Sequence, residues 1–291
     1  MKPIAITGIG CRLPKANSPA QLWRSLCSAQ SAIEEIPDAR YNAEAAYDPR
    51  PGTPGKLYTT TAGLVDDPAR FDASFFGVSG REAEKLDPQA RIMLNVTWEA
   101  LQDANLVPED LRGSETGVYV GSLYAEYERA FLLNPDSYDV YAWVGSTMRS
   151  GLAGRVSSAF DFRGPSIMVD TACSSSLVAL HLACRALQTS DCSLAIAGGS
   201  NLLVDPVYTM GYSSASMLAP NGQAKPFCQD ADGTARSDGV AVVVLKLLEE
   251  ALADGDEVYA VVRGGAINHG GASSPYMQPS QEGQTDLLSR A

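Results

Sequence analysis

The most informative stretch of this chain is VDTACSSSL, residues 169–177. The apolar, β-branched residues 166–169 predict a short buried strand, and the apolar spacing after the turn predicts a helix over 174–187. Cys173 is therefore expected at a strand-to-helix corner, close to a helix N-terminus. Unpaired amide groups and the positive end of the helix dipole favour a thiolate at such a place. Because its neighbours are small and leave room for a substrate, the pattern indicates a nucleophile on a sharp turn.

A buried, unreactive core cysteine is the alternative for Cys173, since free cysteines are commonly buried and inert. The corner placement and the serine-rich start of the helix bring the two interpretations level. The other cysteines have no such setting, and for each of them we expect the core role: Cys11, Cys27, Cys184, Cys192 and Cys228.

The composition is that of an ordinary globular protein, with 45% hydrophobic and 19% charged residues in a chain of 291. A net charge of -12 argues against a nucleic-acid partner. No apolar run approaches membrane-spanning length, and the first apolar segment begins too soon after Met1 for a signal peptide, so we expect no membrane association. Six cysteines without paired spacing predict free thiols and a cytoplasmic location. No Cys-x-x-Cys or His-x-x-x-His spacing supports a metal site.

Short apolar segments alternate with helix-like stretches along the chain. The segments expected to be strands are 3–7, 116–120, 166–169, 194–197, 240–245 and 258–262. The stretches expected to be helices are 19–28, 87–104 and 174–187. Strands that are apolar throughout and alternate with helices predict a sheet covered on both faces, which is an α/β layered architecture.

A weak internal echo suggests how the chain is divided. A strand, a glycine-rich turn and a helix occur over residues 4–26 and again over 258–288. We therefore expect residues 1–255 to form one half that carries the nucleophilic cysteine. Residues 256–291 would then be the first strand and helix of a second, related half.

Several motifs in order along the chain match one family. They are the segments 4–14, 71–77, 86–91, 154–157, 163–166, 169–187 and 231–246. With them the chain resembles the β-ketoacyl synthase (ketosynthase) domains of polyketide synthases and the related fatty-acid condensing enzymes. Two smaller departures stand in the last segment and just before it, where Asp238 takes the place of a usual Glu and Cys228 that of a usual Asp.

The resemblance implies the thiolase-like fold, in which two similar α/β halves pack as five layers, usually as a homodimer. It also implies the reaction. A cysteine thiolate takes an acyl group from a phosphopantetheine thioester on an acyl carrier protein, with no cofactor bound to the enzyme itself. It then condenses this group with a malonyl-type extender that loses CO2. By position Cys173 matches the nucleophile, and its backbone N–H would be one oxyanion-hole donor.

The family's two catalytic histidines have no match here. In the family they belong to a His-Gly-Thr and a Lys-x-x-x-Gly-His segment of the second half. His181 lies about 12 Å along the helix from Cys173, at roughly 1.5 Å per residue, and is expected to serve helix packing. His269 falls in a polar loop that is not the catalytic one. The nucleophile side of the site is present, and the decarboxylation side is not.

Three hypotheses follow. The first is a split ketosynthase in which a complementary C-terminal subunit supplies the two histidines. The second is a non-elongating acyl-transfer subunit that loads Cys173 and passes the acyl group on. The third is a non-catalytic scaffold or docking subunit of a polyketide synthase. A cysteine protease is disfavoured because no base is placed to pair with the thiol.

Overall fold

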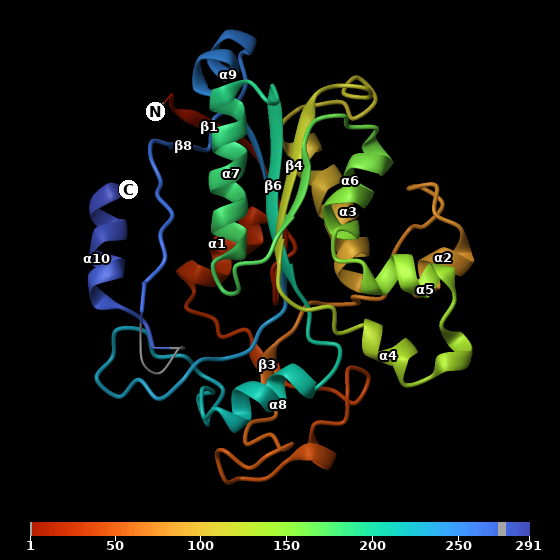
Figure 1. Ribbon diagram of the computed structural model, residues 1–291, viewed down its shortest axis with the longest axis vertical. Coiled ribbons are helices and arrows are strands. Elements are labelled where there is room, and N and C mark those ends of the chain that lie inside the picture. Colours follow the sequence, from red (N-terminus) through yellow and green to blue (C-terminus); the bar gives the residue numbers. More distant parts are fainter. Residues whose placement is uncertain (1, 273–277) are drawn as a thin grey trace.

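A six-stranded mixed sheet forms the centre of the molecule (Figure 1). The computed structural model describes residues 2–272 and 278–291. The strands lie in the order β5-β4-β6-β7-β1-β8. Their bounds are β1 Ile4–Arg12, β4 Thr116–Ser122, β5 Ser166–Val169, β6 Leu194–Asn201, β7 Gly239–Leu247 and β8 Ala260–Val262. All six expected strands are therefore confirmed, although several are longer than their apolar segments.

The sheet is parallel on one side and antiparallel on the other. β5, β4 and β6 run parallel, so their carboxyl ends meet at one edge of the sheet. β7 pairs antiparallel with both β6 and β1, and β8 is antiparallel to β1. Residues that follow β4, β5 and β6 are thereby brought together, although they are far apart in sequence.

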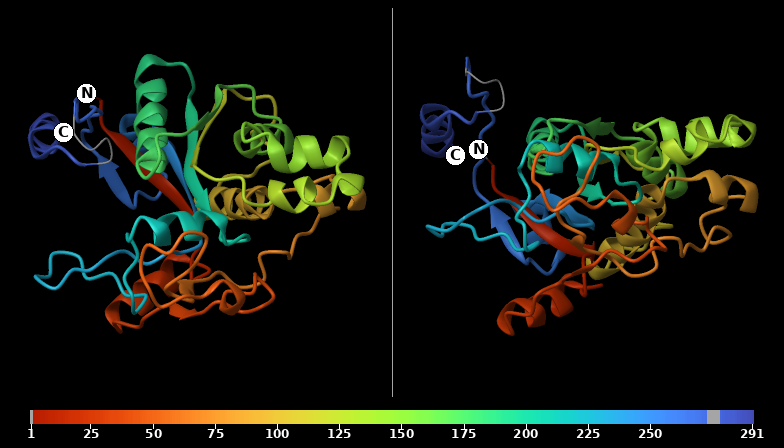
Figure 2. Two further views of the ribbon diagram at one scale, coloured as in Figure 1. Left: turned by 60° about the horizontal axis from the view of Figure 1, so that its bottom comes forward. Right: turned by 90° about the horizontal axis from the view of Figure 1, so that it is seen from below.

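Helices cover both faces of the sheet, as the apolar strands predicted. α7, Ser175–Thr189, packs on β4 and β6 on one face, while α3, Pro88–Asp103, and α6, Gly151–Phe160, pack on the other. Figures 1 and 2 show these helices on opposite sides of the strands. One hydrophobic cluster fills the space between the sheet and α3 with α6, and a second lies under α7.

The smaller elements surround this core. They are α1 Pro19–Cys27, β2 Ile33–Glu35, η1 Glu44–Ala46, β3 Thr61–Gly63, α2 Gly80–Lys85, α4 Glu128–Leu132, η2 Pro135–Ser137, α5 Val140–Ala142, η3 Trp143–Thr147, α8 Val207–Ser214, α9 Leu248–Asp254 and α10 Gln281–Arg290. Residues 40–66 and α8 gather below the sheet in the view of Figure 1, and a third apolar cluster joins them.

The main helix boundaries follow local chemistry. The Asp87 side chain caps α3 by accepting the N–H of Gln89, and Pro88 occupies the first turn, where it loses no hydrogen bond. α9 ends at Gly255, which has a φ of 75°. The expected helices at 19–28, 87–104 and 174–187 are confirmed within two residues at each end.

The proposed division at residue 255 stays a prediction. β8 lies beyond that boundary, yet it extends the central sheet by pairing with β1. Across the described ranges 2–272 and 278–291, no helix has the length and hydropathy needed to cross a membrane.

Candidate active site

Cys173 lies at the corner between β5 and α7. β5 ends at Val169, α7 begins at Ser175, and Ala172 turns the chain with a φ of 56°. A left-handed conformation costs a residue with a Cβ roughly 1–2 kcal/mol, so the corner needs support from its surroundings. The predicted strand, turn and helix are all present, and the thiol stands just before the first turn of the helix.

The side chains of the corner supply that support. The Ser175 hydroxyl accepts the Thr171 N–H at 2.9 Å and donates to the Ala172 carbonyl at 2.6 Å. The Asp170 carboxylate accepts the Ala172 N–H at 3.2 Å and pairs with Arg149 at 2.7 Å. These contacts hold the turn in place and give the serine-rich sequence a structural role.

Two glycines let α7 approach the sheet at the corner. A Cβ on Gly121 of β4 would lie 2.4 Å from the backbone of Ser175 and Ser176. A Cβ on Gly199 of β6 would lie 2.7 Å from the Cβ of Ser176. Because real Cβ contacts are essentially never this short, any larger residue would push the helix start away and displace Cys173 with it.

The thiol of Cys173 is exposed, which contradicts the buried-core alternative for this residue. Cys11, Cys184 and Cys192 are buried as expected. The core role was wrong for Cys27 and Cys228, which are exposed. Cys27 ends α1, a helix with no buried residue, and Cys228 lies on a loop.

A cavity of about 590 Å³ opens beside Cys173. It lies at the carboxyl ends of β4 and β6, against the start of α7. Tyr124, Tyr212 and Arg236 line it together with the thiol. None of these three residues was predicted from the sequence. Only Tyr124 carried a usable signal, because it follows a strand parallel to the one that leads to Cys173.

The two tyrosines and the arginine form one polar cluster. The Tyr124 hydroxyl donates to the Tyr212 hydroxyl at 3.2 Å, and the Tyr124 ring stacks on Tyr208 with 3.9 Å between the centroids. The Arg236 guanidinium lies over both cavity rings, 4.7 Å from the Tyr212 centroid and 5.6 Å from that of Tyr124. Burial, followed by the hydrogen bond with Tyr212, raises the pKa of Tyr124. The Tyr124 phenol is thus held neutral near pH 7.

Glu126 stands behind Arg236 and anchors it. Its buried carboxyl is 3.5 Å from Nη2 of Arg236 and accepts the N–H groups of Val204 and Asp205 at 2.8 and 3.0 Å. Burial outweighs these favourable contacts and raises the pKa of Glu126 to about 7. The Glu126 carboxyl therefore helps to hold the Arg236 guanidinium over the two tyrosine rings, and this carboxyl is titratable.

Asp238 has a structural task at the rim of the cavity. Its side chain is buried, pairs with Arg40 at 2.8 Å, and accepts the N–H groups of Leu203 and Val65 at 2.7 and 3.0 Å. Burial raises its pKa in spite of Arg40. The shorter acid thus keeps a full set of partners in this chain.

Neither histidine lines the cavity. His181 is partly buried on α7, and burial, with Arg185 nearby, lowers its pKa. His269 is exposed and accepts the Gly271 N–H at 3.0 Å. Over the described part of the chain, no three His, Cys, Asp or Glu side chains gather as metal ligands.

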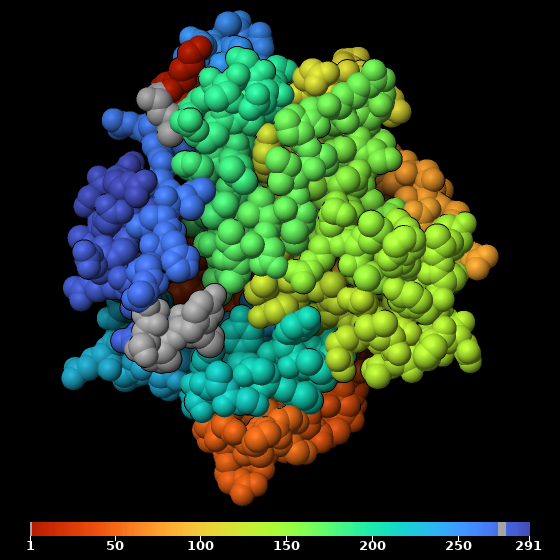
Figure 3. Space-filling model, viewed as in Figure 1, coloured from red at the N-terminus to blue at the C-terminus, as the bar shows by residue number. Residues whose placement is uncertain are grey.

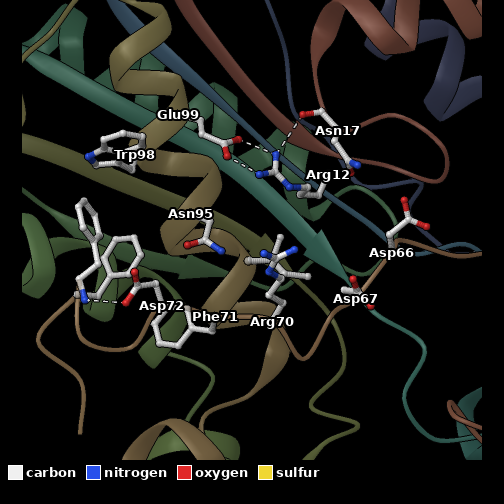
Figure 4. A pocket seen from close by; sticks show the side chains of 13 residues that line it. Arg12, Asn17, Asp66, Asp67, Arg70, Phe71, Asp72, Asn95, Trp98 and Glu99 are labelled. Atoms are coloured by element: carbon white, nitrogen blue, oxygen red, sulfur yellow. Dashed lines mark hydrogen bonds and ion pairs between the residues drawn. The ribbon is translucent and has the colours of Figure 1, made fainter. Parts of the chain in front are cut away.

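A second hollow of about 560 Å³ lies on the α3 face (Figure 4). At one end Arg12 forms a two-pronged ion pair with Glu99. At the other, Phe75 meets Trp98 edge-on, with 5.5 Å between the centroids. It shares no residue with the Cys173 cavity and contains no thiol. The candidate active site is therefore the cavity at Cys173.

The layered sheet with a cysteine at a strand-to-helix corner places the chain in the class of thiolase-like α/β proteins. The chain superposes on the oxazolomycin ketosynthase domain of Streptomyces albus JA3453 with a TM-score of 0.93 and 40% identity, covering 99% of this chain and 50% of that one. It superposes on the ketosynthase from module 6 of the bacillaene synthase of Bacillus subtilis 168 with a TM-score of 0.86 and 34% identity, over 98% and 47% of the two chains.

The family model described as beta-ketoacyl synthase, N-terminal domain, matches residues 1–251, and the chain belongs to this family. It is 43% identical over 291 residues to a phenolphthiocerol/phthiocerol polyketide synthase of Mycobacterium tuberculosis. It is 42% identical over 290 residues to a mycocerosic acid synthase-like polyketide synthase of Mycolicibacterium smegmatis. The matches cover the whole chain and 99% of it, but only 19% and 14% of the relatives. The chain thus corresponds to the N-terminal domain of a ketosynthase and spans about half the length of the ketosynthases on which it superposes.

Proposed function

We propose that Cys173 accepts an acyl group from an acyl carrier protein and holds it as a thioester for condensation with a malonyl-type extender. The observation that carries the proposal is the exposed thiol at the head of α7, open to a cavity large enough for an acyl chain. The resemblance of residues 169–187 to the nucleophile segment of ketosynthases supports the same residue.

Loading is a transfer between two thiols. The Cys173 thiolate attacks the carbonyl carbon of the phosphopantetheine thioester, and the tetrahedral oxyanion accepts the backbone N–H of Cys173 as one of its donors. The intermediate then collapses and the C–S bond to the carrier breaks. The carrier thiol leaves with the proton that Cys173 gave up, so no redox partner or bound cofactor is needed.

Condensation needs groups beyond those around Cys173. Histidine suits the polarisation of the extender carbonyl and the stabilisation of the enolate formed when CO2 leaves. The ketosynthases compared above are about twice as long as this chain. We propose that a histidine-bearing second half completes the site, as a complementary subunit, and that the assembled domain is a dimer served by a carrier protein.

A non-elongating acyl-transfer role is the second candidate. It is favoured by one observation, which is that neither His181 nor His269 lines the Cys173 cavity. Acyl transfer requires only the thiolate, the oxyanion donors and a carrier. The scaffold role stays as the third hypothesis and predicts that Cys173 is dispensable.

Intact-protein mass spectrometry after incubation with an acyl-carrier-protein thioester tests the loading step. We expect one acyl adduct on the wild type and on Cys228→Ala, and none on Cys173→Ala. Cys228 is the matched control because it is also exposed but lies on a loop and does not line the Cys173 cavity. An adduct that persists in Cys173→Ala, or pathway output unchanged by this substitution, would overturn the proposal.

Addition of the extender and a histidine-bearing half separates the first two candidates. Condensed product that forms only with both components supports the split ketosynthase. Acyl transfer to a second carrier without condensed product supports the non-elongating role. Failure of a co-expressed second half to co-purify with this chain counts against the split arrangement.

A further inference from the structure

The hydroxyl of Tyr212 has a hydrogen to donate inside the Cys173 cavity. It accepts a hydrogen bond from Tyr124, and among the residues that the structure describes nothing accepts its own hydrogen. Three serine hydroxyls of the same wall are already engaged, Ser122 and Ser200 with Gln89 and Ser175 with the Ala172 carbonyl. The cavity therefore offers a preoriented donor whose acceptor is not among these side chains.

Arg236 strengthens this donor. Its side chain is only 10% exposed, and it is fixed by Glu126 with the guanidinium carbon 4.7 Å from the Tyr212 ring centroid. A cation on the face of a phenol draws electron density from the ring and makes the O–H a better donor. The buried Nε of Arg236 also lacks a partner among the described residues. The corner of the cavity formed by Tyr212 and Arg236 is thus rich in donors.

The remaining wall has the opposite character. Leu180, Ala197, Ala241 and Val243 line the cavity with apolar groups. An alkyl chain fits such a wall but leaves the Tyr212 hydrogen without an acceptor, and a half-buried unpaired polar group is unfavourable. An acyl chain with an oxygen atom supplies the acceptor and still satisfies the apolar surface.

We propose that Tyr212, oriented by Tyr124 and Arg236, makes this site prefer acyl chains that carry a hydroxyl or carbonyl oxygen over unsubstituted ones. The inference rests on the proposed function, because the acyl chain loaded on Cys173 is the group that occupies the cavity. One neutral hydrogen bond of this kind corresponds to a preference of about fivefold.

The experiment compares two carrier-bound acyl groups of equal length, butyryl and 3-hydroxybutyryl. The rate of Cys173 acylation is measured in the full polypeptide that carries these residues, assembled with its histidine-bearing half. We expect the wild type to load 3-hydroxybutyryl about fivefold faster and Tyr212→Phe to load both at the butyryl rate. Tyr208→Phe is the matched control, since Tyr208 stacks on Tyr124 outside the cavity lining, and it should retain the preference.

The butyryl rate reports on the fold of each variant. A loss of both rates in Tyr212→Phe would show a structural role and overturn the inference. Equal wild-type rates for the two groups would overturn the specificity but leave the proposed function standing. No acylation of Cys173 by either group would overturn both.

Discussion

The two faces of the central sheet differ in how completely their helices are buried. On one face α3 buries eleven of its sixteen residues, and α6 closes the rest of that layer. On the other face α7 buries six of its fifteen residues, and Leu177 near its start remains 70% exposed. Figure 3 shows α7 in green at the surface of this face.

The two faces therefore differ in role: the α3 face is mainly packed core, and the α7 face contains the candidate active site. The α3 face is a closely packed hydrophobic layer, and burial of its apolar surface favours folding. The α7 face presents the cysteine corner, the cavity and an apolar outer side. In the thiolase-like arrangement two halves pack against one another, and the outer side of α7 is suited to that contact. We propose that the same helix positions Cys173 for the chemistry and offers its outer side to a second half.

Truncation of Leu101 should have the largest effect on stability. Leu101 lies on α3 with no exposed surface, so Leu101→Ala removes contacts that the surrounding layer cannot replace. We expect a loss of about 2–5 kcal/mol in the free energy of unfolding, measured with denaturant. Leu101→Met, which conserves volume, should cost less than about 1.5 kcal/mol. Equal costs for the two variants would show that the α3 layer is loosely packed.

Substitution of Gly121 should disturb the close contact between β4 and the start of α7. We expect Gly121→Ala to cost about 1–3 kcal/mol and to lower the rate of Cys173 acylation, because the backbone of Ser175 must move. Gly154→Ala is the matched control on α6, where nothing lies within 4 Å of the added Cβ. It should stabilise the chain by about 0.5–1 kcal/mol. A Gly121 variant with normal stability and acylation would show that the corner tolerates displacement.

The sequence predicts the turn at Cys173 better than it predicts the distant residues that share its cavity. The β5–turn–α7 unit was predictable because an apolar run, small turn residues and helical spacing are all local signals. Tyr212 and Arg236 reach the same cavity from α8 and the loop before β7, and periodicity carries no information about such pairing. α6 escaped prediction because two glycines and two serines give its ten residues a low helix propensity.

Glu126, which contacts Arg236 behind the cavity, should make the free energy of unfolding depend on pH. Its pKa is raised from 4.5 to about 7 in the folded chain, so the unfolded state loses the proton first as the pH rises. The stabilisation is complete below about pH 4.5 and is lost as the pH rises through about 7, by at most about 1.4 kcal/mol per pH unit.

Unfolding measured between about pH 5 and about pH 7 tests this dependence. Glu126→Gln should flatten the profile, because the amide keeps an acceptor for the backbone N–H groups and does not titrate. Glu109→Gln, at an exposed position, serves as the control and should follow the wild type. Parallel profiles for Glu126→Gln and the wild type would show that Arg236 and the two N–H groups outweigh burial.

The smallest effect on stability is expected at the outer side of α7. Leu177→Ala removes a side chain that is 70% exposed and should change the free energy of unfolding by less than about 0.5 kcal/mol. Leu187→Ala, the same change ten residues along the same helix, removes a side chain that is 1% exposed and should cost about 2–5 kcal/mol. If Leu177 contacts the second half, its truncation should weaken assembly with that half while leaving the chain's own unfolding unchanged. A large loss of stability from Leu177→Ala alone would mean that the α7 face is already closed in this chain, and the contrast between the two faces would disappear.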